Sequence, residues 1–89
     1  MPILSMFYGI IVRMYNESGG RHKMPHLHAQ YQEHKIVVNI DTFETMEGSF
    51  PKKQYHQLLA WMGIHQDELK ANWILLSGGE AAFKVEPLK

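Results

Sequence analysis

The chain has 89 residues, with nine basic and nine acidic side chains, six histidines and no cysteine. This length suits one hydrophobic core, so we expect a single domain over residues 1–89, small enough for a partner subunit to add stability. The balanced charge excludes the overall basic field that drives nonspecific nucleic-acid binding. The lack of cysteine excludes disulfides and thiolate zinc sites and is typical of a cytoplasmic protein.

Residues 3–15 form an apolar run rich in Ile, Val, Phe, Tyr and Met. This composition predicts one long strand, with a bulge or a close backbone approach at Gly9. The run is too short to span a bilayer and no basic segment precedes it, so we expect no targeting segment and no membrane contact. The stretch from Asn16 to Met24 contains Gly19-Gly20 and predicts a loop.

Further strands are predicted in the first half of the chain. Residues 26–31 and 35–40 favour two strands joined by a tight turn at residues 32–34, and residues 45–50 favour another. Together with the first run they predict an antiparallel meander of about four strands.

The second half has helical spacing. Pro51 suits the first turn of a helix, whose apolar positions continue to Gly63. A second helix is predicted over residues 65–76, and residues 82–85 could return as a closing edge strand. We therefore expect an α+β fold in which a mostly antiparallel sheet packs against a helical pair. The apolar positions that carry the two helices are Tyr55, Leu58, Leu59 and Met62, then Leu69, Trp73 and Leu76.

Three histidines, His22, His26 and His28, lie within seven residues. Imidazole exchanges protons near neutrality, and its neutral form is a common metal ligand. Pro25 suits the start of a strand, in which side chains alternate between faces. His26 and His28 should then share one face, about 7 Å apart at Cα.

Several segments together resemble a known family. Phe7-Tyr8-Gly9-Ile10, Lys23-Met24-Pro25-His26-Leu27-His28-Ala29, Glu47-Gly48-Ser49-Phe50-Pro51 and Asp67-Glu68-Leu69-Lys70-Ala71-Asn72-Trp73 resemble, in order and spacing, the small bacterial family called domain of unknown function 4160. Members of that family are encoded beside a second small family, and such pairs have been proposed as type II toxin–antitoxin modules. The resemblance implies a toxin-like chain with an antitoxin-like partner. Many relatives show Asp-His-x-Pro-Pro-His-x-His, where this chain has Arg21 and Met24 instead of the Asp and the first Pro.

A metal-independent ribonuclease is the first chemical hypothesis. RNA cleavage needs a base for the 2′-hydroxyl, an acid for the leaving oxygen and cationic donors for the phosphate. His26 and His28 would exchange the protons, Arg13 would bind the phosphate, and Tyr15 and His22 would assist. No cofactor is needed in this scheme.

Two alternatives remain open. A His-x-His pair with one carboxylate, from Glu17 or Glu33, is a pattern that can bind a metal ion. Alternatively, the histidine strand is a protein-binding surface without chemistry. The expected partners are the cognate protein encoded by the neighbouring gene and, in the enzymatic case, RNA; a homodimer is also compatible with this size.

Overall fold

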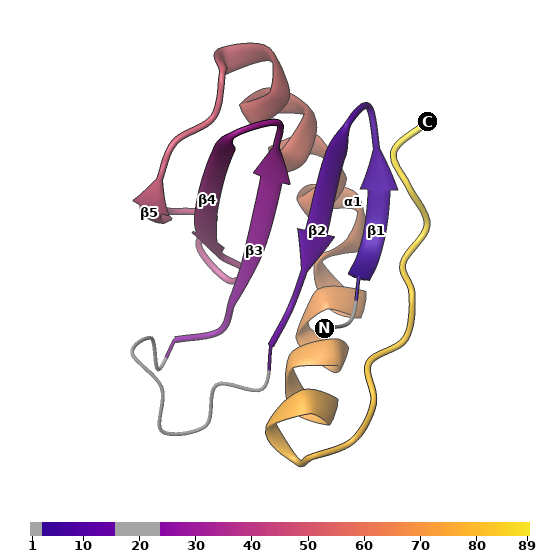
Figure 1. Ribbon diagram of the computed structural model, residues 1–89. Coiled ribbons are helices and arrows are strands. Elements are labelled where there is room, and N and C mark those ends of the chain that lie inside the picture. Colours follow the sequence, from indigo (N-terminus) through magenta and orange to yellow (C-terminus); the bar gives the residue numbers. More distant parts are fainter. Residues whose placement is uncertain (1–2, 16–23) are drawn as a thin grey trace.

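The computed structural model describes residues 3–15 and 24–89 (Figure 1). Five antiparallel strands form one sheet in the order β1-β2-β3-β4-β5, and a helix covers one of its faces. The α+β class and the antiparallel meander are therefore confirmed. The elements are β1 (Ile3–Phe7), β2 (Ile10–Arg13), β3 (His26–Tyr31), β4 (His34–Asn39), β5 (Thr45–Gly48) and α1 (Lys52–Ser77).

The prediction of one long strand over residues 3–15 is wrong, because this run forms the hairpin β1–β2. Tyr8 and Gly9 make the turn with φ angles of 49° and 81°, the backbone that two-residue hairpin turns require. A Cβ added at Gly9 would also lie 3.1 Å from the Tyr31 ring. Gly9 thus marks a turn and not a bulge, and the sheet gains a fifth strand.

The prediction of a helical pair is also wrong, because α1 is one helix of 26 residues. It kinks at His65, whose φ of −112° and ψ of 22° are non-helical, two residues after Gly63. Gly lowers helix propensity by about 1 kcal/mol relative to Ala, which weakens the helix here. Met62 and Leu69, on either side of the kink, are nonetheless buried in the same core, so both parts of the helix pack against the sheet.

The hydrophobic core lies between α1 and the face of the sheet that it covers. Trp61 of α1 is fully buried, and its ring centroid lies 5.2 Å from that of Phe7 in β1. Alternate strand residues supply the other side of the core, as expected for a sheet with one covered face. These buried strand residues include Leu4, Ile10, Val12, Leu27, Ala29, Ile36 and Val38.

The C-terminal residues run beside β1 without forming the predicted closing strand (Figure 1). The Val85 amide makes one backbone hydrogen bond to the Leu4 carbonyl, at 2.8 Å. Side chains of α1 hold the rest of the tail. The buried Asn72 donates to the Phe83 carbonyl at 3.0 Å and accepts from the Phe83 amide at 2.8 Å. These contacts replace the pairing that a strand would have made.

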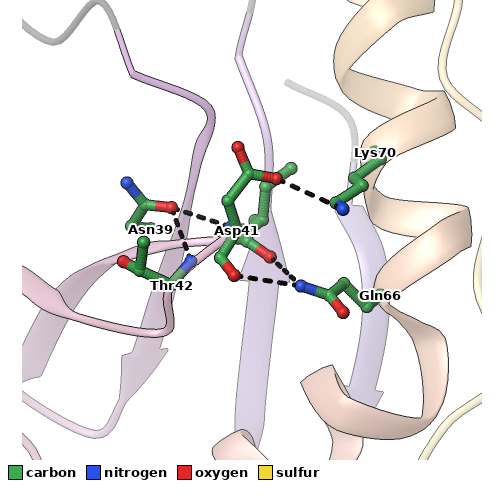
Figure 2. A network of polar contacts seen from close by, with 6 residues as sticks. Asn39, Asp41, Thr42, Gln66 and Lys70 are labelled. Carbon is green, nitrogen blue, oxygen red and sulfur yellow. Dashed lines mark hydrogen bonds and ion pairs between the residues drawn. The ribbon is translucent and has the colours of Figure 1, made fainter.

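The turn after β4 ties the sheet to the helix, as Figure 2 shows. The side-chain oxygen of Asn39 accepts from the amides of Asp41 and Thr42, at 2.7 and 3.0 Å. Gln66 of α1 donates to the Asp41 carbonyl at 3.1 Å, and Lys70 lies 3.6 Å from the Asp41 carboxylate. Because Asn39 pairs with His26 in the sheet, this network also fixes the start of β3.

Candidate functional site

The face of the sheet that α1 does not cover, called here the open face, carries a hollow of about 890 Å³. Its walls come from β2, β3, β4 and β5, and Tyr15, two residues after the end of β2, adds to them. Side chains alternate between the two faces of a sheet, so this hollow receives the residues between the core positions. The polar residues that line it are Arg13, Tyr15, His28, Gln30, Lys35 and Glu47.

The strand register places four residues in one row across the open face. Arg13 of β2 is opposite His28 of β3, which is opposite Val37 of β4, which is opposite Glu47 of β5. Directly opposed residues have Cβ atoms about 4.5–5.5 Å apart, so Arg13 and His28 are immediate neighbours. Lys35 lies two residues from Val37 on the same face, diagonally beside His28. The imidazole of His28 therefore has Arg13 directly beside it and Lys35 diagonally beside it, and the carboxylate of Glu47 ends the row.

His28 is half-buried and lines the hollow. Tyr15 packs edge-on against it, with ring centroids 4.6 Å apart. The ring is therefore oriented by its neighbours while it still faces the hollow. It can exchange a proton with a molecule bound there.

His26 has a different environment. It is 1% exposed, does not line the hollow, and packs 5.3 Å from the His28 ring and 5.1 Å from the Trp73 ring. Its Nδ1 lies 2.7 Å from the Met24 carbonyl oxygen, which can only accept, so Nδ1 donates the proton. The pairing of β3 with β2 ends at His28, so no residue of β2 lies opposite His26, whose ring contacts Trp73 of α1.

The predicted site residues thus fall into three groups. Arg13, Tyr15 and His28 line one hollow. His26, which was expected to exchange protons together with His28, is instead buried outside the hollow, and its ring packs against that of His28. His22 lies outside the described residues.

Sequence reasoning missed Lys35 and Glu47. The predicted hairpin of residues 26–31 and 35–40 was sufficient to find Lys35, because the alternation of side chains along its strands places Lys35 on the same face as His28. Glu47 carried no such signal, because β4 and β5 pair with a register shift between Val37 and Val38.

The position of Glu47 depends on a close approach of the backbone. A Cβ added at the next residue, Gly48, would lie 2.0 Å from the Lys35 carbonyl oxygen. Gly48 also has a φ of 76°, which other residues rarely adopt. Glycine therefore lets β5 lie against β4 and present Glu47 to the hollow.

The metal hypothesis finds no ligand set in residues 3–15 and 24–89, where no group of three or more His, Cys, Asp or Glu side chains could hold an ion. Glu33 lies in the turn between β3 and β4, at the opposite end of β3 from His26. Glu17 and His22, the other candidates, lie outside the described residues.

One protein family, described as Domain of unknown function (DUF4160), matches residues 9–74. The chain belongs to this family. The DUF4160 match runs from β2 into α1 and includes all the residues that line the hollow. No curated protein and no solved structure matches the chain. Within the described residues, no helix has the length and apolar character needed to cross a membrane.

Proposed function

We propose that this protein is the toxin-like component of a bacterial two-gene module and that it cleaves RNA on the open face without a metal ion. The observation that carries the proposal is the place of His28. It lies directly opposite Arg13 and diagonally beside Lys35, in a hollow on the uncovered face. A group that exchanges protons between two cations suits the phosphodiester of RNA.

Each of these residues has its own task in the proposal. Arg13 offers several donors in a planar fork and Lys35 a compact charge, so both bind phosphate oxygens and stabilise the charge that develops there. His28 exchanges a proton with the substrate. Tyr15 and His26, whose rings pack against His28, hold its imidazole in position.

The test is cleavage of single-stranded RNA by the purified protein in the presence of a chelator. We expect RNA fragments, and His28→Ala should lower the rate by about 10²–10⁴-fold, the usual worth of a proton-transferring group. His56→Ala is the matched control, because His56 is exposed on α1 and does not line the hollow. Absence of cleavage, or equal rates for His28→Ala and the wild type, would refute the proposal. Loss of cleavage on adding chelator would favour the metal hypothesis.

The cognate protein encoded by the neighbouring gene belongs to the same proposal. A partner that inhibits cleavage would compete with phosphate for Arg13 and Lys35, so we expect it to present acidic side chains to the open face. Co-expression should therefore yield a complex that does not cleave RNA, and Arg13→Glu should weaken it. A complex unaffected by that charge reversal would place the partner elsewhere on the protein.

A further inference from the structure

Glu47, whose carboxylate ends the row across the open face, has no role in the proposed function so far. Glu47 is half-buried and lines the same hollow as His28. The register places Val37 between them, opposite both, so two strand spacings separate their backbones, about 9–10 Å. Their side chains therefore stand on either side of Val37, within reach of one small group bound between them.

Val37 supplies the floor of this gap. Its side chain is apolar and lines the hollow, so it adds no competing polar group. Lys35 lies on the same strand and the same face, beside the gap. A phosphate group above Val37 would thus meet the imidazole on one side, the carboxylate on the other and an ammonium group beside it.

We propose that Glu47 and His28 form the acid–base pair of this site and that the substrate is a phosphodiester with a free 2′-hydroxyl, which means RNA and not DNA. This inference rests on the proposed function. Carboxylates are ionised at neutral pH and act as bases, whereas an imidazole can carry the proton that a leaving oxygen needs. Glu47 and His28, separated by Val37, would therefore each carry out one of the two proton transfers: Glu47 as the base and His28 as the acid.

The reaction balances with these groups alone. The Glu47 carboxylate takes the proton of the 2′-hydroxyl, and the 2′-oxygen forms a bond to phosphorus. The bond from phosphorus to the 5′-oxygen breaks, and the His28 imidazolium gives its proton to that oxygen. The products are a 2′,3′-cyclic phosphate and a 5′-hydroxyl, and water returns the proton from Glu47 to His28.

The test is the pH dependence of the cleavage rate for the wild type and Glu47→Gln. The wild type should give a bell-shaped profile, because the base must be ionised and the acid protonated. Glu47→Gln should lower the maximal rate about 10²–10⁴-fold and remove the acidic limb, leaving the alkaline limb. Glu47→Asp should keep the acidic limb at a reduced rate. Glu44→Gln, an exposed residue outside the hollow, is the matched control and should behave as the wild type.

The outcomes separate the two proposals. If the wild type cleaves RNA and Glu47→Gln keeps both its rate and its acidic limb, this inference is wrong while the proposed function stands. An equal rate on DNA of the same sequence, or products without a cyclic phosphate, would overturn it as well. If the wild type cleaves no RNA at all, the proposed function and this inference fail together.

Discussion

Replacement of His26 by alanine should destabilise the protein, because this side chain is 1% exposed and contacts several neighbouring residues. The variant loses a hydrogen bond to the Met24 carbonyl and the ring contacts with Trp73 and His28. A buried hydrogen bond contributes about 0.5–1.5 kcal/mol and each aromatic contact a similar amount, so we expect a loss of about 2–4 kcal/mol. For a domain of this size that corresponds to a fall in Tm of about 10–25 °C.

Thermal unfolding followed by circular dichroism measures this loss, with two variants for comparison. His28→Ala removes a half-buried ring and should cost about 1 kcal/mol, and the exposed His56→Ala should stay within about 0.5 kcal/mol of the wild type. The two neighbouring histidines would then differ, with His26 supporting the fold and His28 the activity. A Tm for His26→Ala equal to that of the wild type would refute the packing described for this ring.

Three further predictions concern stability and are measured by urea unfolding. Asn72→Ala removes both hydrogen bonds between α1 and Phe83 of the C-terminal tail and should cost about 1–3 kcal/mol, with faster proteolysis of the tail; an unchanged proteolysis rate would contradict this attachment of the tail. Gly48→Ala forces a side chain into the neighbouring backbone and should destabilise the sheet, whereas Gly63→Ala, with open space around it, should stabilise the helix by about 0.5–1 kcal/mol. Similar effects at the two glycines would show that β5 is not held against β4 as described. Lys70→Ala removes only a surface ion pair with Asp41 and should change stability by less than about 1 kcal/mol; a larger loss would give that pair a structural role.

Local pattern was sufficient for most of the strands and for the helical half. Residues 26–31 and 35–40 alternate between core and open face, and the turn between them was correctly predicted to within a residue. The alternation also brings His28 to the same face as Arg13. The fold class followed from these elements.

The errors over residues 3–15 and in the helical half have a common physical origin, since each concerned the effect of a glycine. Gly9 lies between two strands that both carry buried apolar residues, so composition shows no break between β1 and β2. Gly63 weakens the helix without ending it, because contacts with the sheet on both sides outweigh its low propensity. Tertiary packing decides both cases, and the local sequence does not contain it.

The candidate site could be predicted in part. The spacing of His26 and His28 indicated a shared face, but the end of the β2–β3 pairing leaves His26 buried against Trp73. Glu47 is far from the histidines in the chain and reaches them only through the register of β4 and β5. Long-range register of this kind depends on turns and bulges that short motifs do not encode.

The central claim, that the open face binds RNA, is tested most directly with an RNA that cannot be cleaved. A 2′-O-methyl oligonucleotide lacks the attacking hydroxyl and therefore reports binding alone. In an NMR titration we expect amide shifts confined to strand residues of the open face, including Arg13, His28 and Lys35, and a weaker response at higher salt. The outer face of α1, where Ile64 and Ile74 are exposed, should not respond. Shifts centred on that helix, or none at millimolar oligonucleotide, would contradict the account.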